Sequence, residues 1–313
     1  GSASQNTGEV VRIDMENNYA PDKRFNYPAF TTNGHTSSPH AEAIHIRGDR
    51  VYVLFAISYN GVDEYDPSEI VEFDLELNYK RTFKLEDTGN NGVAGKNPAR
   101  MAYYNGKLYV ACMGGFQGPN SWGDIWEVDL AAASPAAPKR VLDGHAIPHD
   151  LGGGTYAAVG MYGIQFASDG TAYILTGSYD SGYTFRARLF VTTAADLAAG
   201  NVTNNNNVVA TYTTFDGHSW DILYDEEESM LWCMAGKTLQ ARSKDGKTLV
   251  KSFKPIDLGD DIYSISLLSD GSVLSSGGGG GGGGGGCDAG FTSAALLMLA
   301  LGLMLRRRKG NRP

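Results

Sequence analysis

Short apolar runs alternate with tight turns along most of the chain. Within each run, apolar and polar residues alternate with a period of two, which is the pattern of a half-buried β-strand. Five turns each separate two such runs, namely Gly48-Asp49, Asn105-Gly106, Asp169-Gly170, Asp225–Ser229 and Asp270-Gly271. Asn-Gly and Asp-Gly between alternating apolar residues are strong signals for a β-hairpin. The pattern therefore predicts five hairpins and an all-β body.

Four of the five hairpins are followed by two more strand-like runs. These pairs of runs are Glu69–Leu75 with Lys80–Leu85, Asp124–Leu130 with Lys139–Leu142, Arg188–Thr192 with Val208–Tyr212, and Thr238–Ser243 with Thr248–Lys254. Each unit thus predicts a sheet of four antiparallel strands joined in chain order. Repeats of this size, with one four-stranded sheet in each, are typical of propeller folds.

The fifth hairpin lacks its outer pair of strands, because Leu274 runs almost directly into a glycine run. A matching segment lies at the opposite end of the chain. Residues 9–19 (EVVRIDMENNY) align with residues 69–79 (EIVEFDLELNY), and residues 124–130 (DIWEVDL) are a third copy. We therefore expect the N-terminal segment to supply the outer strands of the last unit, which would close a five-bladed β-propeller. A six-bladed ring with one undetected unit and an open β-sandwich remain as alternatives.

Two segments resemble strands of known repeat proteins. Residues 108–112 (LYVAC) and 125–130 (IWEVDL) resemble the YVTN-like and Trp-Asp-like repeats of β-propeller proteins. The resemblance implies the fold of the body and no particular activity, since propellers host binding modules and enzymes alike.

The last part of the chain differs in composition from the body. Gly277–Gly286 is an uninterrupted glycine run, which behaves as a flexible tether. An uncharged apolar stretch, Phe291–Leu305, follows and leads into the basic cluster Arg306–Lys309. The stretch lies near the lower length limit of a membrane-spanning helix, and the basic cluster predicts a cytoplasmic end. The chain thus divides into a propeller at 1–276, a poly-Gly linker at 277–286 and a sorting or membrane-anchor segment at 287–313.

This order of features resembles the C-terminal sorting segments of bacterial surface proteins, of the Synerg-CTERM and GlyGly types. Gly285, Gly286 and Cys287 carry the resemblance, together with the apolar stretch and the basic cluster. The resemblance implies an exported protein of the cell surface or outer envelope, anchored transiently or stably by the C-terminal helix. It also implies a sorting protease at the membrane that processes the chain near these three residues.

Composition limits the classes of function. Apolar residues make up 42% of the chain, which is enough to bury a core. The formal net charge is −9, and the basic end of the tail leaves the body more acidic still. An acidic body argues against nucleic acid as a partner, because phosphate binding needs a positive surface. Only 3 cysteines are present, which excludes a disulfide framework.

The connections between the predicted strands are short at one face of the ring and long at the other. The long connections are Pro28–Ala41, Ala56–Ser68, Glu86–Ala99, Met113–Gly123, Asp143–Gly160 and Gly177–Phe185. Long loops on a rigid scaffold tend to carry function. The residues that we expect to bind a ligand lie in these loops or where the channel-lining strands begin: His40, Tyr59, Arg100, Trp122, His149, Tyr162, Tyr183, Trp220 and Tyr263.

A catalytic alternative involves acids on the innermost strands. Glu42 and Asp221 could converge on the channel as a carboxylate pair, as glycoside cleavage requires, and His218 lies nearby in the sequence. The chain lacks the local motifs of propeller glycosidases, so satisfied inner-strand acids are the simpler interpretation. We therefore treat a hydrolase or lyase, glycosidase-like or lactonase-like, as the alternative function.

Metal binding is not predicted. His145 and His149 are separated by a proline-containing turn and lack a third ligand at a recognisable spacing. The acids of residues 63–66 could offer oxygen ligands to Ca²⁺, yet they lack the spacing of a known Ca²⁺ loop. The sequence thus predicts a monomeric surface propeller without a cofactor, which binds a carbohydrate, peptide or envelope component through its long-loop face.

Overall fold

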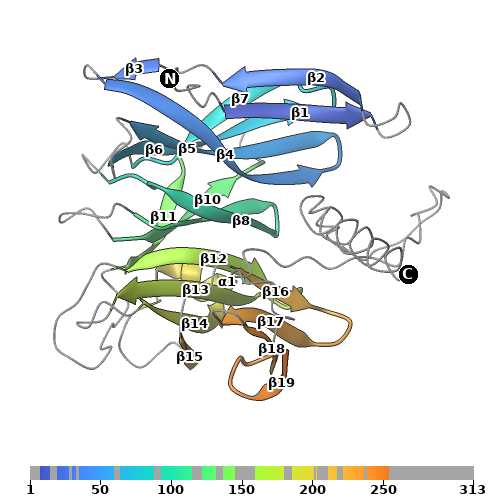
Figure 1. Cartoon of the computed structure of the whole chain (residues 1–313), viewed down its shortest axis with the longest axis vertical. Coiled ribbons are helices and arrows are strands. Elements are labelled where there is room, and N and C mark those ends of the chain that lie inside the picture. Colours follow the sequence, from blue (N-terminus) through green and yellow to red (C-terminus); the bar gives the residue numbers. More distant parts are fainter. Residues whose placement is uncertain are drawn as a thin grey trace, which may run out of the picture.

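The computed structural model describes residues 8–14, 20–27, 30–32, 35–59, 64–87, 93–114, 122–131, 137–144, 159–179, 185–200, 202, 211–216, 221–235 and 238–253. Nearly all of these residues belong to β-strands that pair antiparallel with their neighbours in the chain (Figure 1). The prediction of an all-β body is therefore confirmed for this part of the chain.

The strands form four meandering sheets and a separate hairpin. Sheet 1 contains β3 (Phe30–Thr32), β4 (His35–Arg47), β5 (Arg50–Tyr59), β6 (Glu64–Asp74) and β7 (Tyr79–Lys84). Sheet 2 contains β8 (Pro98–Tyr104), β9 (Lys107–Cys112), β10 (Asp124–Asp129) and β11 (Lys139–Asp143). Sheet 3 contains β12 (Gly160–Phe166), β13 (Thr171–Tyr179), β14 (Phe185–Thr193) and β15 (Thr211–Asp216). Sheet 4 contains β16 (Ile222–Asp225), β17 (Met230–Ala235), β18 (Thr238–Ser243) and β19 (Leu249–Phe253). The N-terminal hairpin contains β1 (Gly8–Asp14) and β2 (Ala20–Tyr27).

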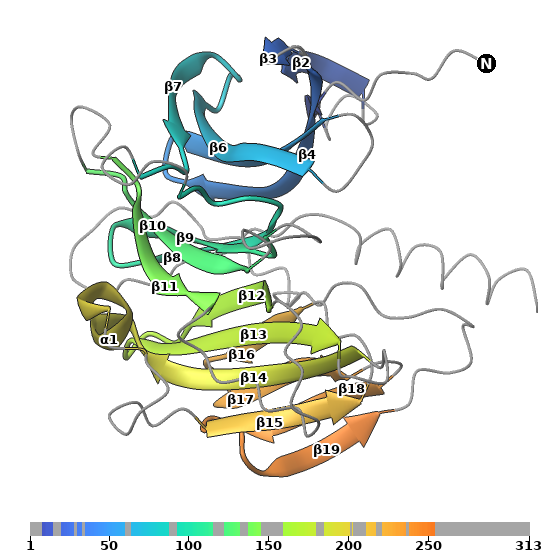
Figure 2. The same cartoon turned by 90° about the vertical axis from the view of Figure 1, so that its left-hand side faces the viewer.

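Consecutive sheets stack face to face from the N-terminal hairpin to sheet 4 (Figures 1 and 2). Alternate residues of a strand therefore enter different cores, as strand geometry requires. On β9, Leu108 and Val110 pack toward sheet 1, whereas Tyr109 and Ala111 pack toward sheet 3. This explains why the middle strands are apolar on both faces, and burial of this kind stabilises the fold by about 25 cal/mol per Å² of apolar surface.

The innermost strands of neighbouring sheets lie against one another. β4 contacts β8, β8 contacts β12, and β12 contacts β16. Sheet 1 has β3 as an additional edge strand. When β3 is set aside, each of these four strands is the first of a meander of four strands. The beginnings of four strands that are far apart in the sequence are therefore gathered along one line.

The predicted hairpin turns are confirmed in the four sheets. Gly48, Gly106 and Gly170 have φ values of 56°, 85° and 87°, the left-handed conformation that favours glycine. The fifth predicted turn, Asp270-Gly271, lies outside the described residues.

Three of the predicted long loops are partly strand. β4 begins at His35, β5 continues to Tyr59, and β6 begins at Glu64, so sheet 1 extends well into the segments expected to be loops. β13 and β14 likewise extend to Tyr179 and Phe185. Polar residues such as Ser58 and Ser178 interrupt the apolar alternation in these extensions, so the sequence pattern does not reveal the strands there.

A short helix, α1 (Ala194–Ala199), was not predicted from the sequence. Thr193 caps its beginning by accepting a hydrogen bond from the Asp196 backbone N–H, and Gly200 ends it with φ 69°. Only Leu197 of this helix is buried, so one apolar side chain gives no helical periodicity to detect.

The N-terminal segment forms two strands, as its alignment with residues 69–79 predicts. In the N-terminal hairpin Val10 pairs with Phe25, and both pack on the outer face of sheet 1 beside Val53 and Phe73. The corresponding pair in sheet 1 is Ile70 with Phe83, which packs on sheet 2, and the pair in sheet 2 is Ile125 with Leu142, which packs on sheet 3. The hairpin thus meets sheet 1 as sheet 1 meets sheet 2.

A repeated hydrogen bond marks the same relationship. Arg12 of the hairpin donates to the Leu75 carbonyl oxygen of sheet 1 at 2.9 Å, and Arg81 of sheet 1 donates to the Leu130 carbonyl oxygen beside sheet 2 at 2.9 Å. Lys139 of sheet 2 donates to the Ala198 carbonyl oxygen beside sheet 3 at 2.8 Å. In each case a cation from an outer strand reaches the backbone just beyond the third strand of the next sheet.

The predicted linker and anchor at residues 277–313 lie outside the described residues. Within the part that the structure describes, no helix has the length and apolar character needed to cross a membrane. Cys112 and Cys233 are buried free thiols, in agreement with the absence of a disulfide framework among the described residues.

Candidate functional site

The innermost strands share a structural irregularity that positions polar side chains. β4, β8 and β12 each carry a bulge, with Glu42, Ala99 and Tyr162 as the respective extra residues. The bulge lies near the beginning of β8 and β12 and within the second half of β4. These residues occupy the same position relative to the second strand of their sheets. A bulge bends the strand and redirects its side chains, and bulges are common beside functional sites.

The residue after each bulge occupies a second equivalent position. Arg100 pairs with Ala111, and Gly163 pairs with Leu175. In sheet 4 the backbone N–H of Met234 donates to the carbonyl oxygen of Asp221, which places Asp221 at the corresponding point. The register of the sheets thus brings Arg100 and Asp221 to the same level along the line of innermost strands.

Arg100 and Asp221 form an ion pair across this line. The Arg100 Nε lies 3.5 Å from the Asp221 Oδ1, and the side chains are 31% and 13% exposed. Asp221 Oδ1 also accepts a hydrogen bond from the Ile222 backbone N–H at 3.0 Å. Because the carboxylate is largely buried, the pair is better shielded from solvent than an ordinary surface ion pair.

Glu42 lies in the electric field of the same guanidinium. Burial of its carboxyl raises the pKa of Glu42, whereas His40 and Arg100 act in the opposite direction. The residue nevertheless keeps contact with solvent. A carboxyl that is partly enclosed by protein yet reached by water can still contact a ligand.

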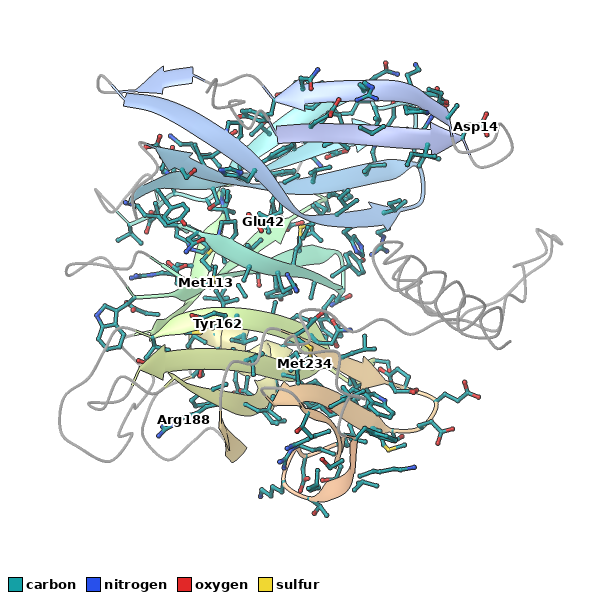
Figure 3. All side chains as sticks on the ribbon, viewed as in Figure 1. Asp14, Glu42, Met113, Tyr162, Arg188 and Met234 are labelled. Carbon is teal, nitrogen blue, oxygen red and sulfur yellow. The ribbon has the colours of Figure 1, made fainter. Side chains whose placement is uncertain are left out.

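His40 acts on the charge of Glu42, and its Nε2 is 3.0 Å from the Ser58 Oγ, which fixes the imidazole beside the second strand of sheet 1. Tyr162 lies on β12, between β8 and β16, and its ring packs in the core between sheets 3 and 4 (Figure 3). A Cβ at Gly160 would come within 2.8 Å of this ring, so only glycine leaves space for it.

The structure therefore brings together four of the residues predicted for the site, namely His40, Glu42, Arg100 and Asp221. Tyr162 lies on the neighbouring strand β12, but its side chain packs in the core between sheets 3 and 4. Trp122 precedes β10, the third strand of its sheet, and so lies two strands away from this line. The Tyr59 side chain, His149, Tyr183, His218, Trp220, Tyr263, and Gly285, Gly286 and Cys287 lie outside the part that the structure describes.

One contributor was missed in the sequence analysis. Met113 follows β9 and packs against the core between sheets 3 and 4, which includes Tyr162 (Figure 3). Its side chain brings sheet 2 into contact with that core. Met113 could have been identified from its position directly after the buried strand β9. This position lies at the same end of sheet 2 as Arg100.

Within the described ranges, no group of three or more His, Cys, Asp or Glu side chains is arranged to hold a metal ion. The arrangement can instead offer hydrogen bonds of both kinds, since Arg100 donates while Glu42 and Asp221 accept. Tyr162 and Met113 pack in the adjoining core between sheets 3 and 4. Such a mixture suits a polar ligand with hydroxyl or amide groups.

Comparison with known proteins leaves the chain unassigned to a family. No family model matches it, and no curated protein matches its sequence.

Solved structures show distant likeness. The dihydro-heme d1 dehydrogenase NirN in complex with DHE is similar over 81% of this chain and 62% of its own length, with 11% identity and a TM-score of 0.32. The extracellular domain of a one-component system from B. thetaiotaomicron is similar over 69% of this chain and 28% of its own, with 9% identity and a TM-score of 0.34. A third is the WD40 domain of SCAP from fission yeast, with 8% identity, a TM-score of 0.26, and 80% and 71% of the two chains covered. The chain thus spans less than two thirds of the length of the first two.

Proposed function

We propose that this chain is an exported surface protein that binds a carbohydrate, peptide or envelope component where its innermost strands begin. The observation that carries the proposal is the Arg100–Asp221 ion pair, which joins the beginnings of the innermost strands in sheets 2 and 4. Glu42 of sheet 1 lies in the field of the same guanidinium. Polar groups from three sheets thus lie close together, as they do in ligand sites.

The charges of the cluster indicate the kind of ligand. Arg100 is already paired with Asp221, and Glu42 adds a second acid, so an anion would meet no unbalanced positive charge. A neutral ligand with many hydroxyl or amide groups can use the donor and both acceptors. This favours an oligosaccharide or an uncharged peptide segment over phosphate or nucleic acid.

Surface attachment forms part of the same proposal. The ten glycines of Gly277–Gly286 would span at most about 36 Å, and they connect the body to the apolar stretch and basic cluster. A sorting protease acting near Gly286-Cys287 would release the body or transfer it to another anchor. The order of features in the sequence supports this part of the proposal.

The body is proposed to be a closed five-bladed ring of the YVTN or Trp-Asp type, acting as a monomer. The support comes from the N-terminal hairpin, which meets sheet 1 as sheet 1 meets sheet 2 and so has the position of an outer half-blade. Next to it, Ile44 and Ile46 of β4 are 49% and 39% exposed, although their partners Val53 and Val51 are buried under the hairpin. Among the described residues β1 pairs only with β2. Residues 263–274 are the segment of this chain with the strand pattern to pair with β1 and cover these isoleucines.

Replacing Arg100 by Met is expected to reduce ligand affinity at least tenfold. The substitution removes the donor and leaves the Asp221 carboxylate without its cation, which removes about 1.4 kcal/mol or more of binding free energy. The measurement is an array of oligosaccharides and uncharged peptides probed with the full chain in mild detergent, followed by a titration of any ligand found.

Arg24→Met is the matched control, because Arg24 is 53% exposed on β2 and pairs there with the exposed Glu9. This variant should bind as the wild type does. If the array yields no ligand, or if both variants keep full affinity, the proposed binding site is wrong.

A hydrolase or lyase is the second candidate, and the state of Glu42 favours it. Glycoside cleavage uses one protonated carboxyl as acid and one ionised carboxylate as base or nucleophile. Glu42 with its raised pKa suits the first role, and Asp221 beside Arg100 suits the second. The array experiment separates the two candidates, since a hydrolase would convert a bound oligosaccharide into products and a binding protein would return it unchanged.

A further inference from the structure

Asp124 is a carboxyl group enclosed at the edge of the candidate site. It begins β10 and pairs with Cys112 of β9 on one side and Asp143 of β11 on the other. The residue is 6% exposed, and the Cys112 and Trp126 side chains on the same face of the sheet are fully buried. This face of sheet 2 packs toward sheet 1. Asp124 thus lies between two sheets, where a charge is costly.

Residues Gly95–Asn97, the last part of the connection from sheet 1 to sheet 2, pack on the neighbours of this carboxyl group. A Cβ at Gly95 would come within 2.7 Å of the Trp126 Nε1 and 3.1 Å of the Cys112 Sγ. The connection therefore rests directly on the side chains that flank Asp124. Arg100 follows Asn97 by three residues, so the position of the connection also determines the position of Arg100.

Four backbone hydrogen bonds hold the connection in place. The N–H groups of Met113 and Gly114 donate to the carbonyl oxygens of Asn97 and Lys96 at 2.8 and 3.1 Å. The Ser68 N–H donates to the Gly95 carbonyl oxygen at 2.8 Å, and the Gly95 N–H donates to the Leu85 carbonyl oxygen at 2.8 Å. If the connection moves away from Asp124, these four hydrogen bonds must break first.

The surroundings of Asp124 suit a neutral carboxyl better than a carboxylate. Within the described part of the chain, the Asp124 Oδ1 and the Trp126 Nε1 are buried without a hydrogen-bond partner of good geometry. The charged groups that face Asp124 are Arg140 and Asp143 of β11, and they form an ion pair with each other at 3.0 Å. The Cys112 thiol of β9 is its remaining titratable neighbour, and burial raises the pKa of that thiol too. Burial raises the pKa of Asp124 to about 8, although Trp126, Arg140 and Cys112 lower it in part.

We propose that the protonated Asp124 carboxyl is a latch beneath the connection 95–97, and that its ionisation releases this connection and with it the beginning of β8 that carries Arg100. A carboxylate at this position needs water. β9 and β11 flank Asp124 as paired strands, whereas the connection above it is held by only four bonds. Water therefore reaches the ionised group by displacing the connection. Asp124 is thus a positioning residue for Arg100.

The linkage between ionisation and folding has a defined sign. The unfolded carboxyl titrates near its ordinary pKa of about 4, and the folded one near about 8. The folded state therefore holds a proton that the unfolded state has lost, so folding becomes less favourable as pH rises between these values. The folding equilibrium constant falls up to tenfold per pH unit in this window and is level above it. Across pH 8 the folded protein itself changes from latched to released.

Hydrogen–deuterium exchange of the full chain tests the latch without any ligand, so the result is independent of the proposed binding function. After correction for the intrinsic pH dependence of exchange, the amides of Ser68, Gly95, Met113 and Gly114 should lose protection at least tenfold between pH 6.5 and 9. The amides of β13 in sheet 3 should keep theirs. In Asp124→Asn, which is neutral at every pH, the four amides should stay protected throughout.

Glu127→Gln is the matched control, since Glu127 is a buried acid on the same strand that faces sheet 3 and bonds to Lys107 and Tyr109. It should leave the pH profile of the four amides as in the wild type.

A second measurement is the difference in urea unfolding free energy between the wild type and Asp124→Asn. This difference, wild type minus variant, should fall with pH up to about 8 and then level off. Constant protection of the four amides in the wild type, or an equal loss in Asp124→Asn, would overturn the latch.

Discussion

Replacing Val10 by Asp is expected to destabilise the protein by about 3–5 kcal/mol, because the substitution places an unpaired charge in an apolar interface. Val10 is 5% exposed and packs with Val53, Phe55 and Phe73 of sheet 1. Phe25 and Tyr27 of β2 share this interface, so the charge would disturb the attachment of the whole N-terminal hairpin. Urea unfolding followed by intrinsic tryptophan fluorescence measures the loss.

Tyr79→Asp provides the matched control for this prediction. Tyr79 lies on β7, the outer strand of sheet 1, and is 57% exposed, so a charge there remains in water and should cost less than about 0.5 kcal/mol. Equal effects of the two substitutions would mean that the N-terminal hairpin is not part of the core.

Replacing Gly123 by Ala is expected to be the most destabilising glycine substitution in the described part of the chain. A Cβ at this position would lie 2.6 Å from the Met161 backbone nitrogen and closer still to the Cys112 carbonyl oxygen. Both obstacles are backbone atoms, which cannot rotate away as a side chain would. The Gly123 N–H also donates to the Val159 carbonyl oxygen, so sheets 2 and 3 would have to separate here. We expect a loss of about 3 kcal/mol in the urea unfolding free energy, the upper end of typical overpacking costs.

Gly163→Ala tests whether this cost comes from the close approach. Gly163 is also buried, but a Cβ there would meet its nearest atom, on Leu175, at 3.4 Å. Its cost should remain within about 1 kcal/mol, because the new methyl group fits and the unfolded chain loses freedom. If both alanine variants are equally stable, the close approach at Gly123 is not a constraint.

The strand order of the sheets was predictable because the signals are local. Asn105-Gly106 and Asp169-Gly170 specify tight turns, and alternation on either side specifies the strands. The N-terminal hairpin was predictable for a different reason, since its sequence repeats that of residues 69–75 with the same apolar positions. Strand extensions such as the beginning of β4 were missed, because polar residues such as Thr36 and Ser37 carry no strand pattern.

The geometry of the site was predictable only in part. The candidate residues of the site could be selected because they lie near the predicted starts of the innermost strands. The bulges at Glu42 and Tyr162 could not be predicted, because they depend on the register with a second strand. The ion pair between Arg100 and Asp221 joins residues of different sheets and follows from the stacking of those sheets alone. Local sequence contains neither kind of information.

The buried environment of Asp124 could not be predicted from the local sequence either. Its segment aligns with the one that contains Glu69; Asp124 begins β10, and Glu69 lies within β6, the corresponding strand of sheet 1. The Tyr27 hydroxyl of the N-terminal hairpin donates to Glu69, whereas Asp124 is covered by the connection 95–97. The difference arises from what packs over each strand, so equal sequence positions acquire unequal environments.

The stability of Ile44→Asp in the full chain tests the closed ring, the central claim, most directly. Ile44 is 49% exposed among the described residues, much as Tyr79 of β7 is at 57%. If residues 263–274 complete the fifth sheet, they cover Ile44 and leave Tyr79, on the outer strand of sheet 1, in water. Ile44→Asp should then lose about 3 kcal/mol in urea unfolding, as expected for a buried unpaired charge, and Tyr79→Asp should lose less than about 0.5 kcal/mol. Small and equal losses in both variants would contradict the closed ring.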